Sequence, residues 1–190
     1  TGYSYGFHGY WTRDWSALDP SFGTKKDLAE LVQKAHAKGI RILLDAVINH
    51  TGPVTAEDSV YPNDWVRTTP KCTYKSYDTY INCTLVDNLP DVKTESNETV
   101  ALPPFLIEKW KKEGRYEQEV AELDAFFAKT GYPRAPKYYI MKWLSDYITD
   151  YGIDGYRVDT AKHTYEDVWA DFKKVCDQAF DDIKKNNPEK

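Results

Sequence analysis

Two short apolar runs, each ending in polar residues, constrain the fold more than any other feature of this sequence. The first is IRILLDAVINH at residues 40–50, and the second is GIDGYRVD at residues 152–159. A continuous apolar run bounded by polar residues is typical of a strand buried on both faces, as in a parallel sheet. Helical patterns flank both runs, so the order of elements predicts an α/β fold with a parallel sheet.

Helical periodicity predicts five helices. The first has Thr24 as its N-cap and ends at Gly39, and the helix before the second strand ends at Gly152. The remaining helices are predicted near residues 106–112, 116–129 and 165–185. We expect inward faces made of Leu28, Leu31, Val32 and Ala35 in the first helix, Ile140, Trp143, Leu144, Tyr147, Ile148 and Tyr151 before Gly152, and Val168, Phe172, Val175, Ala179 and Ile183 in the last.

The region between these two α/β units breaks the regular order. Prolines punctuate it, and no clear strand period occurs before residue 100. A span of more than about 80 residues is too long for an ordinary connection, so we predict an inserted subdomain. The predicted division is residues 1–50 (loop, helix, strand), 51–136 (insertion) and 137–190 (helix, strand, helix). Two strands are too few for a stable parallel sheet, so we expect the chain to be a slice of a larger domain.

Composition narrows the choice of function. The chain has 41% apolar and 29% charged residues and a net charge of −5, without a basic stripe, which argues against nucleic acid as a partner. No run approaches the ~18 apolar residues of a transmembrane helix. Cys72 and Cys83 lie at a spacing that favours a loop-closing disulfide and hence an oxidising compartment, and Cys176 is predicted to be a free buried thiol. The opening residues read as the middle of a loop, so we expect the protein to continue upstream.

Polar residues follow both predicted strands, where α/β barrels place their chemistry. Arg157 and Asp159 are two apart and should point to the same side of the second strand. An arginine that keeps a neighbouring aspartate ionised makes that aspartate a good nucleophile or base. A buried ion pair without catalytic work is the alternative, and Asn49 and His50 after the first strand could equally serve as caps or loop hydrogen bonds.

Five motifs occur together in one order: HGYW at 8–11, FGT at 22–24, AHAKGIRILLDAVINH at 35–50, LPDV at 89–92 and GYRVDTAKH at 155–163. In this combination the sequence resembles the α-amylases of glycoside hydrolase family 13 over essentially its whole length. The resemblance implies a partial TIM (β/α)8 barrel, about strands 3 and 4 with their flanking helices, and an irregular subdomain inserted after the third strand.

The resemblance also implies roles for individual residues. Asp159 falls on the family's catalytic nucleophile, and Arg157 on the arginine that orients it. The implied sugar-binding residues are Tyr10, His50, Lys162 and His163, the last two on the leaving-group side.

A calcium ion is the implied cofactor, held by Asn49, Asp91 and the backbone carbonyl of His163. Calcium prefers such oxygen ligands, six to eight in all, and the resemblance implies one further side-chain ligand from the insertion. For Asp91 alone, a turn residue after Pro90 is the plainer interpretation.

Retaining hydrolysis also needs a second, protonated carboxyl group about 5 Å from the nucleophile. After Asp159 the sequence contains only Glu166 and Glu189, and neither follows a strand, so we expect the acid, and a third carboxylate, beyond Lys190. The implied activity is endo-hydrolysis of α-1,4-glucan (starch, glycogen or maltodextrin) by a monomeric, extracellular or periplasmic full-length protein. The alternatives are a transglycosylase or α-glucosidase of the same family, and a noncatalytic glucan-binding protein.

Overall fold

The computed structural model describes residues 6–53, 61–85 and 89–189. Helices and short strands alternate along the chain. In order they are α1 (Lys25–His36), β1 (Leu43–Ala46), β2 (Val66–Arg67), β3 (Asp91–Val92), α2 (Pro104–Lys112), α3 (Tyr116–Thr130), α4 (Pro136–Tyr151), β4 (Gly155–Val158) and α5 (Glu166–Asn186), with short 3-10 helices at Tyr77–Thr79 and Ala161–His163.

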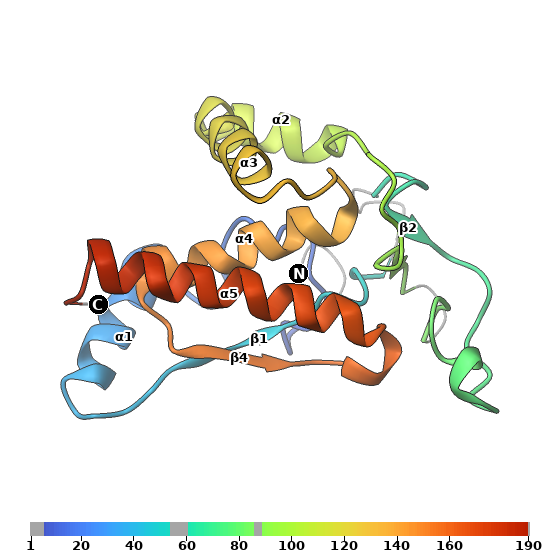
Figure 1. The fold of residues 1–190 in the computed structure, drawn as a ribbon, viewed down its shortest axis with the longest axis horizontal. Coiled ribbons are helices and arrows are strands. Elements are labelled where there is room, and N and C mark those ends of the chain that lie inside the picture. Colours follow the sequence, from blue (N-terminus) through green and yellow to red (C-terminus); the bar gives the residue numbers. More distant parts are fainter. Residues whose placement is uncertain (1–5, 54–60, 86–88, 190) are drawn as a thin grey trace.

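The centre of the fold is a parallel pair of strands, β1 and β4, covered by helices. Leu43 lies opposite Gly155 and Asp45 opposite Arg157 in this pair. Helices α4 and α5 run side by side over one face of it (Figure 1). Trp143 of α4 is fully buried in the main core, which α5 closes with residues of its inward face.

The opposite face of β1 and β4 is open, which corrects the prediction of strands buried on both faces. Leu43 is 59% exposed, and the side chains of Asp45 and Arg157 are 44% and 56% exposed. Alternate residues of a strand point to opposite faces. Helices cover the face of Ala46, whereas no described element covers the face of Leu43, Asp45 and Arg157.

The helices confirm most of the local predictions. Thr24 and Asp27 form a reciprocal capping box at the start of α1, and Gly152 ends α4 in the left-handed conformation that favours glycine. All five residues predicted to face inward from α5 are buried. Leu31 is the exception in α1, because it is 52% exposed.

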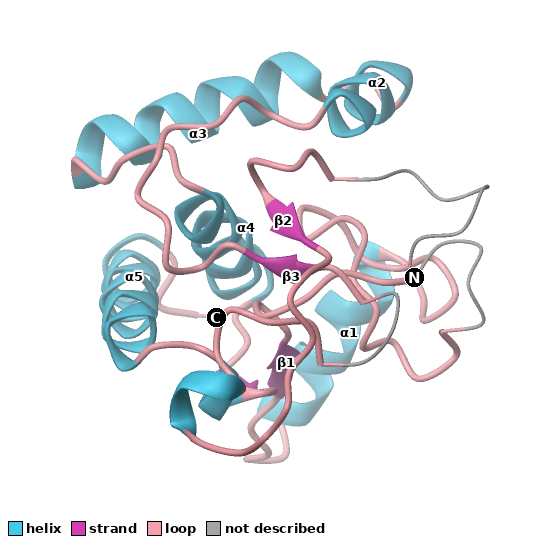
Figure 2. Cartoon of the chain, turned by 90° about the vertical axis from the view of Figure 1, so that its right-hand side faces the viewer, coloured by secondary structure: helices cyan, strands magenta, loops and turns pink. Residues whose placement is uncertain are grey.

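The region between β1 and α4 holds a small antiparallel sheet and a pair of helices (Figure 2), together with a loop closed by a disulfide. Strands β2 and β3 form a two-residue antiparallel pair, and a disulfide joins Cys72 to Cys83 as predicted. Helices α2 and α3 form a hairpin packed above α4 (Figure 1). We call α2 and α3 with the turn at residues 113–115 the α2–α3 hairpin.

Candidate active site

The predicted nucleophile lies at the carboxyl end of the parallel pair. Asp159 directly follows β4, and its backbone N–H donates to the carbonyl of Ala46 at 3.0 Å. This bond continues the β1–β4 ladder by one residue, so the backbone of Asp159 is fixed by the sheet. Its side chain is 18% exposed.

Arg157 bridges two carboxylates on the open face of the sheet. Its Nη1 donates to Oδ1 of Asp159 at 2.9 Å and to Oδ1 of Asp45 at 3.2 Å. The hydrogen bond that Arg157 donates to Asp45, together with the charges of both carboxylates, raises the pKa of Arg157. The predicted pair therefore exists, but its arginine is exposed rather than buried. The cost expected for a buried ion pair does not apply here, because water reaches the guanidinium.

An aromatic ring and a buried imidazole flank this pair. The guanidinium of Arg157 lies 5.8 Å from the ring centre of Tyr10, within the range of a cation–π contact. His50 is 5% exposed, and burial lowers its pKa despite the opposing charge of Asp159 and a hydrogen bond to the backbone of Tyr10. A neutral imidazole can donate or accept a hydrogen bond to a sugar hydroxyl.

Lys162 and His163 contact the disulfide-closed loop instead of the Arg157 pair. The ammonium of Lys162 lies 5.8 Å from the ring centre of Tyr80. Nδ1 of His163 is 2.7 Å from the carbonyl oxygen of Tyr80, and the residue is 8% exposed. The charge of His163 also lowers the pKa of His50, so the two histidines lie close to each other.

The three predicted calcium ligands come from segments that meet at Asn49. The carbonyl of Asn49 accepts the N–H of Val92 at 2.8 Å, and Oδ1 of Asn49 accepts from Oγ1 of Thr164, the residue after His163, at 3.3 Å. His50 pairs with Asp91 as an isolated bridge. The segments carrying all three groups are therefore adjacent.

The chemistry of this junction fits an oxygen-coordinated cation. Asn49 is 1% exposed, and its Nδ2 has no hydrogen-bond partner among the described residues. Rotating the side-chain amide would place Oδ1 at the position that Nδ2 now occupies. Asp91 is buried, and burial raises its pKa to about 8 although the charge of Arg67 opposes this shift. Arg67 Nε lies 3.7 Å from Oδ2 of Asp91, so the carboxylate already has one weak cationic partner. No cluster of three His, Cys, Asp or Glu side chains suited to a metal occurs in the described part of the chain.

Known proteins match this arrangement over nearly the whole chain. The model of the α-amylase catalytic domain matches residues 4–190. The chain belongs to the α-amylase family. The periplasmic α-amylase of Escherichia coli K12 is 33% identical over 98% of this amylase chain, which covers 33% of that protein. The α-amylase of Saccharomycopsis fibuligera is 29% identical over 90% of the chain and 30% of its own length.

A solved structure gives the same answer for the fold. The crystal structure of the Geobacillus thermoleovorans α-amylase with acarbose superposes with a TM-score of 0.65 at 26% identity, over 92% of this chain and 31% of the other. The parallel pair and its helices thus correspond to part of a TIM barrel. The amylase chain spans about a third of the length of the relatives it matches. No helix in its described ranges is long and apolar enough to span a membrane.

Several contacts of the amylase site were not predicted from sequence. Asp45 shares Arg157 with Asp159, which only the parallel register between β1 and β4 could have shown. Arg67 faces Asp91, and Tyr80 faces both Lys162 and His163, across loops without a periodic pattern. No sequence signal we used predicts such loop contacts.

Proposed function

We propose that the full-length protein hydrolyses α-1,4-glucosidic bonds of starch-like glucans with retention, and that this chain supplies the nucleophile Asp159. The hydrogen bond from Arg157 to Asp159 at the carboxyl end of β4 is the observation that carries the proposal. A charge-assisted bond of this kind fixes one oxygen of the carboxylate and leaves the other to react.

In this proposal the Asp159 carboxylate attacks the anomeric carbon and forms a glycosyl ester, which water then hydrolyses. Tyr10 offers its ring face to the sugar at the cleavage point, and buried His50 contacts a hydroxyl. Lys162 and His163 line the side from which the leaving glucan departs. The proton for the leaving oxygen comes from a carboxylic acid outside these 190 residues, as does a third carboxylate that holds the sugar hydroxyls.

We further propose that residues 51–136 form a calcium-associated insertion. Asn49, Asp91 and the carbonyl of His163 would hold the ion, whose charge would compensate the buried carboxylate of Asp91. Its role would be to join the insertion to the barrel.

The calcium site is tested by a thermal melt with calcium and with EGTA. Calcium should raise the melting temperature of the wild-type chain, by an amount equivalent to about 2.7 kcal/mol at 100 times the dissociation constant, and should have little effect on Asp91→Asn. An equal calcium effect on both proteins would contradict this site.

Extracellular or periplasmic location is proposed on two supports. The Cys72–Cys83 disulfide requires oxidising conditions to persist, and one relative is itself named as periplasmic.

The hydrolytic proposal is tested by reducing-end release from soluble starch with calcium. In the 190-residue chain, we expect no release of reducing ends from the wild type or from Asp159→Asn. The control variant Asp177→Asn, on the exposed side of α5, should release none either. In a protein extended to the length of its relatives, wild type and the control should be active and Asp159→Asn inactive. Activity of the extended Asp159→Asn would refute the nucleophile assignment, and activity of the 190-residue wild type would refute the missing acid. Product sizes then separate hydrolysis from transglycosylation, and glucan binding without turnover by the extended wild type would identify a noncatalytic binder.

A further inference from the structure

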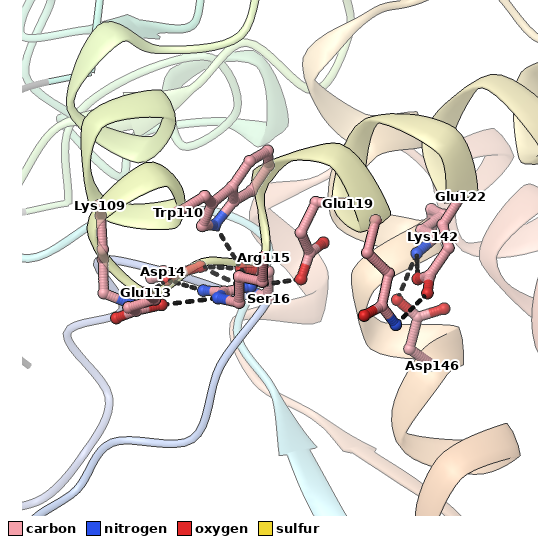
Figure 3. Close-up of polar contacts among 11 residues, drawn as sticks. Asp14, Ser16, Lys109, Trp110, Glu113, Arg115, Glu119, Glu122, Lys142 and Asp146 are labelled. Carbon is pink, nitrogen blue, oxygen red and sulfur yellow. Dashed lines mark hydrogen bonds and ion pairs between the residues drawn. The ribbon is translucent and has the colours of Figure 1, made fainter.

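A network of ion pairs joins the segment at residues 10–16, which carries Tyr10, to the α2–α3 hairpin (Figure 3). Asp14 is at its centre, with a side chain only 9% exposed. Its Oδ2 accepts from Nζ of Lys109 in α2 at 2.5 Å and from Nη2 of Arg115 at 3.2 Å. Residues about 95 and 101 positions apart in sequence are thereby fixed to each other.

Ser16 completes the connection on the other side of Arg115. Its Oγ accepts from Nε1 of Trp110 and from Nη1 of Arg115, both at 3.1 Å, and donates to Oδ1 of Asp14. The hydroxyl therefore uses its donor and both acceptor positions. Two side chains of the 10–16 segment, Asp14 and Ser16, and three of the hairpin, Lys109, Trp110 and Arg115, form one connected network.

Arg115 is itself held rigidly by the hairpin. Its side chain is 16% exposed, donates from Nε to Glu113 at 2.6 Å and contacts Glu119. The guanidinium carbon lies 5.5 Å from the ring centre of Trp110, which is fully buried. Burial alone would lower the pKa of Arg115, but the bond to Glu113 and the charges of Asp14 and Glu119 raise it overall. The cation is thus a fixed anchor for Asp14.

Other anchors of the 10–16 segment come from the residues that follow β1 and from Tyr61, whose hydroxyl donates to the carbonyl of Arg13 at 2.8 Å. The indole Nε1 of Trp15 donates to the carbonyl of Val47 at 2.8 Å, and the carbonyl of Thr12 accepts the N–H of Gly52 at 3.2 Å. Tyr10 lies at the end of this segment, where its ring meets Arg157. A displacement at Asp14 would reach the Tyr10 ring through four residues of backbone.

We propose that Arg115 is a positioning residue of the glucan site, which by holding Asp14 fixes the 10–16 segment and with it the Tyr10 ring beside Arg157. The inference rests on the proposed function for its ligand: the structure shows the contacts between the hairpin and the segment, and the ligand is a glucan only under that proposal. It gives the α2–α3 hairpin a role in sugar binding without any contact between hairpin and sugar.

Hydrogen–deuterium exchange of the 190-residue chain tests the positioning. Arg115→Gln should exchange at least about tenfold faster than wild type in residues 10–16, with α4 and α5 unchanged, because the variant removes an anchor of that segment and none of those two helices. Arg115→Lys keeps a charge facing Asp14 and should restore most of the protection. The control Arg134→Gln removes an exposed pair with Asp124 of the same hairpin and should leave the segment as in wild type. Unchanged exchange in residues 10–16 of Arg115→Gln would overturn the proposal, as would uniform loosening of the whole chain that Arg115→Lys does not rescue.

Maltoheptaose affinity tests the connection to the ligand by a double-mutant cycle. Arg115→Gln should weaken binding about fivefold in the wild-type background and have no further effect in Tyr10→Ala, because it acts through that ring. Equal effects in both backgrounds would overturn the proposed route through Tyr10. The cycle is measured in a protein extended to the length of its relatives. If the wild-type form of that protein binds no maltoheptaose, the glucan assignment fails, and the exchange experiment still decides whether Arg115 positions the segment.

Discussion

Single residues decide the chemistry of this chain, and Arg157 is the clearest case. It touches Asp45, Asp159 and Tyr10 from one guanidinium. The exposure of Arg157 depends on whether another element packs on the open face of the sheet. The sequence pattern of the two strands does not show this, because such an element would lie elsewhere in the chain. The pairing with Asp159 was predictable from the spacing of two, whereas the sharing with Asp45 and the exposure were not.

Arg157→Gln should lower kcat of a protein extended to the length of its relatives by about 10- to 100-fold, since a charge-assisted hydrogen bond to the nucleophile is lost. Michaelis–Menten kinetics on maltoheptaose would measure it. The matched control is Arg41→Gln, an exposed arginine before β1, which should keep wild-type kcat. Equal loss in both variants would point to folding rather than to the nucleophile.

Asp146 should make the stability of the chain depend on pH. Lys142, 5% exposed, lies 2.7 Å from Asp146 and 2.8 Å from Glu122. One ammonium cannot compensate two carboxylates, and burial raises the pKa of Asp146 to about 7. The unfolded value is about 3.9, so the folded state binds this proton more tightly, and stability from this group falls as pH rises from about 4 through 7.

Asp146→Asn removes that titration. The loss of unfolding free energy between pH 5 and pH 8 should shrink by on the order of 1–2 kcal/mol, discounted for partial exposure of the carboxylate. Urea unfolding at the two pH values would measure it, with Asp181→Asn on the exposed side of α5 as the control. A pH dependence equal to that of wild type would show that Asp146 ionises normally.

Among the elements, helices were the best predicted and short strands the worst. Five buried residues over 21 positions define the periodicity of α5. The local pattern and the tertiary contacts therefore favour the same helix. Strands β2 and β3 have two residues each, too few to show an alternation, and they exist because Asp91 and Val92 pair with a distant segment. The network of Asp14 with Arg115 is equally invisible in sequence, because ion-pair partners a hundred residues apart leave no local pattern.

Helix α4 contributes buried residues to both clusters of the core, with Trp143 in the main cluster and Ile148 in a smaller one beside Leu28 of α1. Trp143 is fully buried and its ring lies near those of Trp65, Tyr139 and Trp110. Trp143→Ala should lower the unfolding free energy by about 3–5 kcal/mol through the cavity it leaves, as measured by urea unfolding. Leu31→Ala on the exposed side of α1 should change it by less than about 0.5 kcal/mol. Similar values for the two variants would mean that this core does not support the fold.

At the scale of the whole molecule, the open face and its rim expose apolar side chains. Phe22, Ile40 and Leu43 are 66%, 54% and 59% exposed, and both edges of a two-strand sheet offer unpaired backbone groups. We expect the isolated chain to self-associate as its concentration rises. Light scattering after size exclusion should show a growing mean mass, reduced in Leu43→Lys and unchanged in the control Lys38→Gln. A constant monomer mass up to millimolar concentration would contradict this expectation.

The pairing of β1 with β4 also has a consequence for the order of folding. Asp45 and Arg157 face each other across 112 positions of chain, and closing so long a loop costs entropy before any contact repays it. The capped helices and the α2–α3 hairpin depend on near neighbours, so they can form early, while the sheet must wait for the segment between its strands to become compact. Asp159 and Arg157 therefore come together late, and slow-folding variants of the insertion should delay the candidate site even when their finished structures are identical.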